Sequence, residues 1–384
     1  MPTAPAPHGT PRDLVVLSEV RWGYFRTRKQ FLLSRFPEPW RIFFAQPPGG
    51  DDDPWTPRRE GRVTVFTVPF LKPGTRNALY NAAASTSVGR ALIETAAEWH
   101  LHRMLQRLGV DPEPAVLVSN IYAPAALSRL RKKLVLYDFN DSPFQFSATP
   151  PWARSYWPRT IRQASAVFAV SEFYRRQLVG EIDAPVILLG NGVEVAPFAT
   201  PRPVPADLAA LPRPRIGYVG LLSHFLDFEL LESLRRHRRG GTVVLIGPPS
   251  PATDAQVADF ASREGVAVLG PRPYADVPAY MQGLDVGVIP FRASDPFVQG
   301  INPNKVYQYL AAGLPVITTP VLDLEERRPD LAFASTPEQV GEALAQALEA
   351  SADPVRRRAL AEAHDWDRLA ARMVHEIESR LRAA

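Results

Sequence analysis

The 384-residue chain contains no cysteine, which excludes thiol catalysis, cysteine-ligated metals and disulfide bonds. It also lacks any apolar run long enough to cross a membrane. The N-terminal stretch, residues 1–12, is a Pro-rich polar tail without the apolar core of a signal peptide, and we predict that it is disordered. Without cysteine, redox chemistry does not indicate the compartment, and with neither a membrane span nor a signal peptide the cytoplasm is the default expectation.

Several catalytic signatures are missing as well. No GxxxxGK[ST] loop is present, which argues against a P-loop NTPase, and no GxSxG turn is present, which argues against an α/β-hydrolase. The seven histidines show no HExxH spacing, so no metal site is predicted. No helix-turn-helix, zinc-finger or RNA-binding aromatic signature accompanies the basic residues, so nucleic acid is not an expected partner.

A mild positive charge remains to be explained. The net charge is +4, and basic residues gather in segments 26–36, 128–133 and 233–239. An anionic membrane surface or phosphorylated substrates would both suit them. Segment 26–36 mixes basic and apolar residues as an interfacial helix would, but a helix that packs on its own domain with a solvated basic face is the favoured interpretation.

Short apolar runs alternate with longer helical patterns along the chain, the longest of them around 87–108. The expected strands of the first half are 14–17, 42–45, 63–68, 116–118, 134–137, 167–170 and 186–189, and those of the second half are 216–219, 243–246, 266–269, 286–289 and 315–318. Near-continuous apolar strands that alternate with helices indicate parallel sheets covered on both faces. The predicted fold class is therefore α/β, with two Rossmann-like doubly wound domains facing across a cleft and ligands at the carboxyl ends of the strands.

Proline content suggests where the two domains join. We predict an N-terminal domain over 13–196, a Pro-rich linker over 197–214 and a C-terminal domain over 215–352. The remaining stretch, 353–384, has the pattern of one long amphipathic helix that packs back on the first domain.

The segment 299–319 carries the strongest functional signal. A loop containing Asn302 and Asn304 runs into a short helix, and Lys305 and Gln308 are three residues apart on one face of its first turn. The unpaired N–H groups of a helix start attract anions, and Lys305 adds a full charge. This suits a diphosphate, with Gln308 placed to bond a ribose, although an ordinary loop–helix–strand unit with a solvated lysine would show the same pattern.

Three glycine-containing turns follow expected strands of the second domain. They begin at Gly220, Gly247 and Gly270, and Ser223 and Tyr274 lie within the first and third of them. Glycine lets the backbone approach a phosphate closely, and Ser223 can donate a hydrogen bond. Ordinary turns need glycine too, so the functional interpretation depends on all three lying at one edge of the sheet.

In the first domain, Asp138 and Asp141 follow the strand 134–137. Two carboxylates at the end of a strand can supply a general base, and each would raise the pKa of the other if they lie close. Helix capping is an equally good use of them. Asp138 is slightly preferred as the base because it is nearer the strand.

Five segments in order resemble GT-B-fold glycosyltransferases, in particular bacterial enzymes of surface-polysaccharide assembly of the teichuronic-acid and xanthan glucuronosyltransferase type. They are VFAVSEFYRRQL (167–178), LLGNGVEV (188–195), RIGYVGLLSHFLDFELLESL (215–234), VVLIGPP (243–249) and NPNKVYQYLAAGLPVITT (302–319). The resemblance implies that Lys305 and Gln308 meet the diphosphate and nucleoside of a nucleotide sugar, and that Asp138 or Asp141 is the base that activates the acceptor.

From this resemblance we expect a metal-independent hexosyltransferase with a UDP-sugar as its donor and no further cofactor. Its acceptor would be a hydroxyl group in polysaccharide or glycoconjugate synthesis. The basic and aromatic first domain is compatible with a lipid-linked acceptor and peripheral contact at the inner face of the membrane. Two glutamates of the large retaining group are replaced here by Gly300 and Gln308. A nucleotide-sugar epimerase of the same fold and a non-catalytic binding subunit therefore stay open as alternatives.

Overall fold

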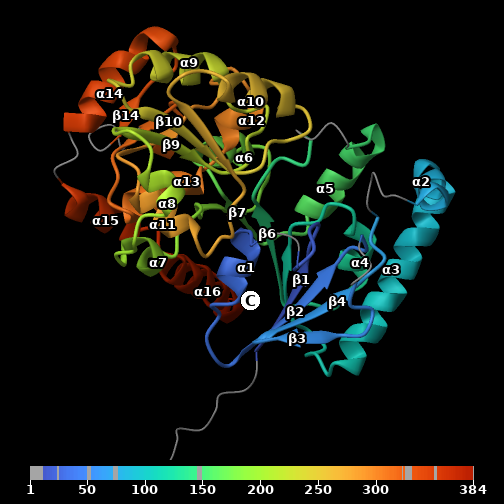
Figure 1. The fold of residues 1–384 in the computed structure, drawn as a ribbon. Helices are drawn as coiled ribbons and strands as arrows, with labels where there is room; N and C mark the ends of the chain where they lie inside the picture. Colours follow the sequence, from blue (N-terminus) through green and yellow to red (C-terminus); the bar gives the residue numbers. More distant parts are fainter. Residues whose placement is uncertain are drawn as a thin grey trace, which may run out of the picture. The chain divides into compact units, whose positions relative to one another are not determined.

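The computed structural model describes residues 12–23, 26–49, 53–71, 77–144, 149–321, 323–324, 331–349 and 353–383. The chain forms two compact units (Figure 1). Unit 1 comprises Met1–Val170, Tyr174–Leu189 and Leu369–Ala384, and unit 2 comprises Ser171–Phe173 and Gly190–Arg368. The predicted disordered tail lies outside the described residues, except for Arg12.

Unit 1 is built on an eight-stranded sheet with the order β3-β4-β2-β1-β5-β6-β7-β8. All neighbouring pairs are parallel except β3 and β4. The strands are β1 (Arg12–Leu17), β2 (Trp40–Gln46), β3 (Arg58–Glu60), β4 (Val63–Thr67), β5 (Ala115–Val118), β6 (Leu134–Phe139), β7 (Ala166–Ala169) and β8 (Val186–Leu188). The exposed edge strand β3 was not predicted because its sequence, RRE, carries no apolar pattern.

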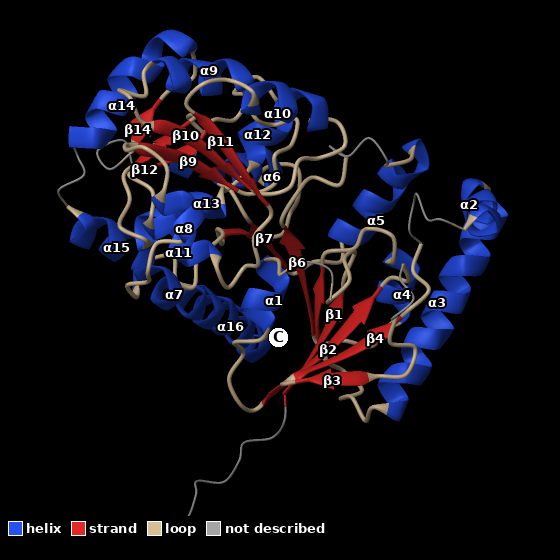
Figure 2. Ribbon diagram, viewed as in Figure 1, coloured by secondary structure: helices blue, strands red, loops and turns tan. Residues whose placement is uncertain are grey.

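Helices cover both faces of this sheet, with α1 and α16 on one face and α3 and α4 on the other (Figures 1 and 2). The helices of unit 1 are α1 (Arg28–Leu33), α2 (Ala78–Ser85), α3 (Ser87–Arg107), α4 (Pro124–Arg129), the 3-10 helix η1 (Pro151–Ser155), α5 (Tyr156–Ile161), α6 (Glu172–Leu178, from Tyr174 onward) and α16 (Trp366–Ala383, from Leu369 onward). All six residues of α1 are buried, so this helix packs on its own unit and is not interfacial, but Arg28 and Lys29 do not form the solvated basic face that the sequence predicted.

Unit 2 contains a six-stranded, all-parallel sheet with the order β11-β10-β9-β12-β13-β14. Its strands are β9 (Arg215–Val219), β10 (Thr242–Ile246), β11 (Val266–Gly270), β12 (Val286–Ile289), β13 (Val316–Thr318) and β14 (Ala332–Phe333). This is the 3-2-1-4-5-6 order of a doubly wound Rossmann sheet, in which the direction of winding reverses between β9 and β12. Unit 1 reverses in the same way between β1 and β5. The predicted doubly wound α/β fold is confirmed in both units.

In unit 2, α9, α10 and α14 lie on one side of the sheet, and α7, α11 and α13 lie on the other (Figure 1). The helices are α7 (Val195–Ala199), α8 (Ala206–Ala209), α9 (Phe228–Arg236), α10 (Asp254–Ala261), α11 (Val277–Gln282), α12 (Pro296–Gly300), α13 (Asn304–Ala311), the 3-10 helix η3 (Pro337–Gln339), α14 (Val340–Glu349) and α15 (Pro354–Glu362).

Two predicted boundaries differ from the structure. The stretch 197–214 contains most of α7 and all of α8 and belongs to unit 2, whose second segment begins at Gly190. The stretch 353–384 holds two helices, α15 and α16, separated at residues 363–365, where the Val193 N–H donates to the carbonyl of His364 at 3.0 Å. In the described part of the chain, no helix combines the length and apolar composition that crossing a bilayer requires.

Candidate functional site

Glycine turns meet at the carboxyl edge of the unit 2 sheet. The Gly220 N–H donates to the carbonyl of Ile246 at 2.8 Å, and the Gly247 N–H donates to that of Gly270 at 2.9 Å. A Cβ atom on Gly247 would lie 1.9 Å from the Gly220 oxygen, and the positive φ of both residues, 150° and 147°, also favours glycine. The three turns therefore pack against one another at one edge, as the sequence predicted.

Lys305 crosses this edge from the first turn of α13. A Cβ on Gly220 would lie only 2.1 Å from its Cε, and its Nζ lies 5.6 Å from the centroid of the Tyr218 ring. Within the described residues its ammonium group makes no hydrogen bond or ion pair. Burial without a counter-charge lowers the pKa of Lys305 to about 8. An anion placed here would therefore meet an unneutralised cation at the start of a helix.

Three other residues that the sequence predicted for this site also have polar groups available for a ligand. The Gln308 residue is buried, but its amide makes no hydrogen bond to the described residues and is not sealed from solvent. Ser223, in the turn after β9, also keeps its hydroxyl free of described partners. Asn304 is the first residue of α13, so its backbone N–H has no acceptor within the helix. These groups, together with Lys305, can surround a polar anionic ligand.

Asn302 and Tyr274 have other contacts. The Asn302 Oδ1 accepts from the Asn191 N–H at 2.9 Å, its carbonyl accepts from the Asn191 side chain at 2.8 Å, and its Nδ2 donates to the Tyr307 hydroxyl at 3.2 Å. These bonds tie the loop before α13 to the loop at 190–191. Tyr274 is partly exposed, and its ring meets that of Phe198 edge-on at 6.5 Å. The role of both residues in ligand binding stays a prediction.

Sequence reasoning missed Tyr309, which fixes the helix that carries Lys305. Its hydroxyl accepts from the Val219 N–H at 2.9 Å and donates to the carbonyl of Gly217 at 3.1 Å. The ring packs against Gly287, where a Cβ would come within 2.5 Å of it. Tyr309 thus fills the point where β9 and β12 diverge, one helical turn from Lys305.

We expect Tyr309→Phe to destabilise the protein by about 1–3 kcal/mol, because the buried Val219 N–H would lose its acceptor. Denaturant unfolding of the variant measures this effect. The matched control is Tyr274→Phe, whose ring is partly exposed and which should unfold as the wild type does. Equal stability of the two variants would contradict this role for Tyr309.

In unit 1, the two predicted carboxylates have different surroundings. Asp138 ends up fully buried and is paired with Arg28 of α1, whose Nε lies 3.1 Å from Oδ1 and 3.4 Å from Oδ2. Asp141 is half-buried and accepts one hydrogen bond from the Asn140 amide at 2.7 Å. Asp138 is therefore held in an ion pair with Arg28, whereas the carboxylate of Asp141 can accept further hydrogen bonds.

Burial raises the pKa of Asp141 to about 7, and the positive charge of Lys29 opposes this shift. Glu19 and Asp138 add smaller contributions that raise it further, so the predicted effect of Asp138 on the pKa of Asp141 is present but minor. A carboxyl group with a pKa near neutrality can take up and release a proton under physiological conditions.

A polar network beside Asp141 was also missed by sequence reasoning. Lys29 lies 2.7 Å from Glu19, which also accepts a hydrogen bond from the Ser119 hydroxyl. Burial disfavours the charged form of Lys29, but Glu19 and the two aspartates outweigh it and raise the pKa of Lys29. Glu19 and Ser119 follow β1 and β5, between which the winding of unit 1 reverses. Only the fold could reveal this network, because its members are up to 100 residues apart in sequence.

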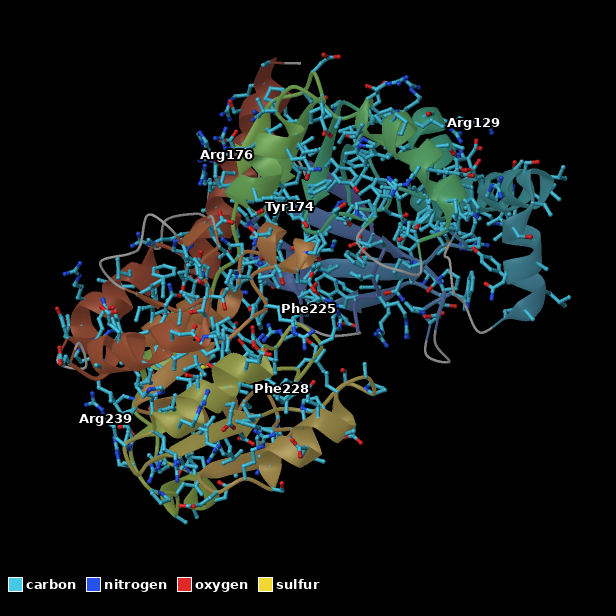
Figure 3. All side chains as sticks on the ribbon, turned by 90° about the horizontal axis from the view of Figure 1, so that it is seen from above. Arg129, Tyr174, Arg176, Phe225, Phe228 and Arg239 are labelled. Carbon is cyan, nitrogen blue, oxygen red and sulfur yellow. The ribbon has the colours of Figure 1, made fainter. Side chains whose placement is uncertain are left out.

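No group of three or more His, Cys, Asp or Glu side chains that could hold a metal ion occurs among the residues the structure describes. The positive charge at the unit 2 edge comes from Lys305 and the start of α13. Figure 3 labels Phe225, which lies in the loop after β9.

Comparisons with known proteins agree with this geometry. Residues 213–350 match the family described as "Glycosyl transferases group 1". TuaH of Bacillus subtilis (strain 168), whose name places it in teichuronic acid biosynthesis as a glycosyltransferase, is 27% identical over 166 residues. That match spans 42% of this chain and 42% of TuaH, so the chain matches less than half the length of this relative.

Solved structures resemble the chain over nearly its whole length. Sucrose-phosphate synthase from Thermosynechococcus elongatus superposes with a TM-score of 0.71 at 14% identity, covering 97% of this chain and 100% of that one. Anabaena Alr3699/HepE in complex with UDP gives a TM-score of 0.64 at 15% identity, covering 96% and 100%. At such low identity the likeness shows the fold alone. The predicted resemblance is confirmed: the chain has the fold of GT-B glycosyltransferases, and its second unit resembles their group 1 domain in sequence.

Proposed function

We propose that this protein is a glycosyltransferase that moves a hexose from a nucleotide diphosphate sugar, UDP-linked, to a hydroxyl acceptor in polysaccharide or glycoconjugate synthesis. The observation that carries the proposal is the half-buried ammonium of Lys305, which lies over the packed turns at Gly220 and Gly247 and has no hydrogen-bond or ion-pair partner among the described residues. The match of residues 213–350 to a glycosyltransferase family and the UDP named with HepE support it.

Unit 2 would hold the donor. Lys305 and the N–H groups at the start of α13 would bind the diphosphate. When the bond between the sugar and the phosphate oxygen breaks, the nucleoside diphosphate leaves with the bonding electrons, and these groups would stabilise its additional negative charge. Gln308, one turn further on, would bond the nucleoside, and Ser223 would donate to a phosphate or sugar oxygen. Because Gly220 and Gly247 have no side chain, the diphosphate could approach the backbone of these turns closely. These groups supply the charge stabilisation without a metal ion.

Unit 1 would activate the acceptor. We assign the general base to Asp141, because its pKa of about 7 and its open accepting capacity suit proton transfer. Asp138 is assigned a structural role through its pair with Arg28. This reverses the slight preference for Asp138 that the sequence suggested. The acceptor oxygen would attack the anomeric carbon of the donor as its proton passes to Asp141.

A lipid-linked acceptor at the inner face of the membrane fits this proposal. The TuaH name refers to assembly of a cell-surface polymer, and the basic residues of unit 1 suit an anionic surface. On this view the protein works in the cytoplasm as a peripheral enzyme.

The activity should depend on pH with a maximum between about 7 and 8. Asp141 must be deprotonated to act as base, so kcat/KM should fall as pH drops below about 7. Lys305 must be protonated to bind the diphosphate, so kcat/KM should fall again as pH rises above about 8. A profile of kcat/KM with donor concentration well below saturation measures both limbs. A flat profile across this range would contradict both assignments.

The activity itself is tested by a thermal-shift screen against UDP-, GDP- and TDP-sugars, followed by measurement of released nucleoside diphosphate. We expect stabilisation by UDP-sugars and acceptor-dependent release of UDP. Interconversion of the sugar without release would instead indicate an epimerase, and the absence of nucleotide binding would indicate a binding subunit.

A further inference from the structure

Exposed apolar side chains gather on one part of unit 1. Ten large hydrophobic residues are exposed in the described chain, and five of them lie on or beside α2 and α3. The five are Trp55, Leu79, Val88, Leu92 and Trp99. We call this group the α2–α3 face. Singly exposed apolar residues need no explanation, but half of a protein's exposed large hydrophobics in one place indicate a binding surface.

Helical spacing places three of these residues in one row. Val88, Leu92 and Trp99 are four and seven residues apart, so they share one side of α3. Their side chains are 70%, 67% and 61% exposed. The opposite side of α3 is the one that packs on the unit, through Ala97, Leu101, Met104 and Leu105. The exposed row is therefore additional to the apolar contacts that hold α3 in place.

The neighbouring helix and loop extend the row. Leu79 of α2 is 84% exposed, and the Trp55 ring meets that of His100 edge-on at 5.9 Å. Helices α2 and α3 form the outer edge of unit 1, with Arg129 labelled close by in Figure 3. No other described element of unit 1 lies beyond them in these views.

The charges of the α2–α3 face have one sign. The guanidinium of Arg103 lies 5.2 Å from the centroid of the Trp99 ring, and Arg107 follows one turn later; neither has an acidic partner among the described residues. The only two acids of these helices are half-buried: Glu98 pairs with Arg129, and Glu94 faces Tyr156. The surface thus combines exposed tryptophan, aliphatic side chains and unpaired arginines.

We propose that the α2–α3 face is the surface by which the protein lies on an anionic lipid bilayer. Apolar side chains would enter the boundary between headgroups and acyl chains, tryptophan would sit at the headgroup level, and arginines would meet lipid phosphates. A second copy of this chain is the less suitable occupant, because self-association would bring Arg103 and Arg107 towards their own copies. The inference rests on the proposed function and names the surface for its membrane contact.

The test is co-sedimentation of the full chain with vesicles made of equal parts phosphatidylglycerol and phosphatidylcholine, and with vesicles of phosphatidylcholine alone. We expect the wild type to bind the anionic vesicles and to lose binding at high salt. The Leu92→Glu/Trp99→Glu double variant should partition at least tenfold less. Val355→Glu, at an apolar position that is 73% exposed on α15, is the matched control and should bind as the wild type does. Arg103→Glu/Arg107→Glu should abolish the preference for anionic vesicles.

Three results would overturn the inference: a wild type that ignores anionic vesicles, a double variant that binds them fully, or a double variant that merely converts a dimer into a monomer in light scattering. UDP affinity, measured on the same proteins, separates this inference from the proposed function. Vesicle binding without UDP binding would refute the donor site but support the α2–α3 face as the membrane surface. UDP binding without vesicle binding would support the donor site but refute the membrane surface. A far-UV circular dichroism spectrum and a melting temperature like those of the wild type verify that the double variant is folded.

Discussion

Asp141→Asn is expected to lower turnover by about a hundredfold to ten-thousandfold, the usual contribution of a positioned general base. The amide keeps the size of the side chain but cannot accept the proton of the acceptor. Since burial of the charged carboxylate is unfavourable, as its raised pKa indicates, the melting temperature should stay close to that of the wild type or rise. Release of UDP under saturating donor and acceptor measures the turnover.

Asp138→Asn is the paired variant and should behave in the opposite way. Asparagine would leave the buried guanidinium of Arg28 without its counter-charge, at a cost of about 3–5 kcal/mol of stability. Any folded fraction should retain the activity that Asp141 provides. Collapsed turnover with normal melting in Asp138→Asn, together with near-normal turnover in Asp141→Asn, would return the base to Asp138.

Lys305→Ala is expected to weaken UDP binding about tenfold to a hundredfold. A charge-assisted hydrogen bond contributes about 1.5–3 kcal/mol, and each 1.4 kcal/mol corresponds to about a factor of ten in affinity. The fold should persist, because no described residue depends on the ammonium for a hydrogen bond. Removal of the lysine should even relieve the cost of a desolvated charge in the free protein.

Calorimetric titration with UDP compares the variant with Lys132→Ala. Lys132 is a suitable control because burial also lowers its pKa, but it belongs to unit 1, whereas the glycine turns belong to unit 2. Its variant should bind UDP as the wild type does. Equal affinities for Lys305→Ala and the wild type would remove the diphosphate from this position.

The sequence was most informative where local pattern and tertiary structure coincide. Apolar runs of β-branched residues predicted twelve of the fourteen strands in the described part of the chain, because parallel strands that are buried on both faces need apolar side chains throughout. The three glycine turns could be placed at one edge because parallel strands end together. The strands β3 and β14 were not predicted, because they are only three and two residues long and lie at the edges of their sheets.

Contacts between residues distant in sequence could not be predicted. The partner of Asp138 is Arg28, 110 residues earlier, so the ion pair that suits Asp138 to a structural role could not be predicted from local pattern. The role of Tyr309 depends on contacts of its hydroxyl with β9 and β12, which lie too far from it in the sequence for a helical pattern to indicate. Likewise, periodicity alone did not show which apolar side of α3 faces the core.

Amide hydrogen exchange with and without saturating UDP tests the central claim, that a nucleoside diphosphate binds where Lys305 crosses the glycine turns. The account predicts slower exchange at the turns beginning at Gly220 and Gly247 and at the first turn of α13, with the α2–α3 face unchanged. Unaltered exchange at these turns, with protection elsewhere or nowhere, would contradict it.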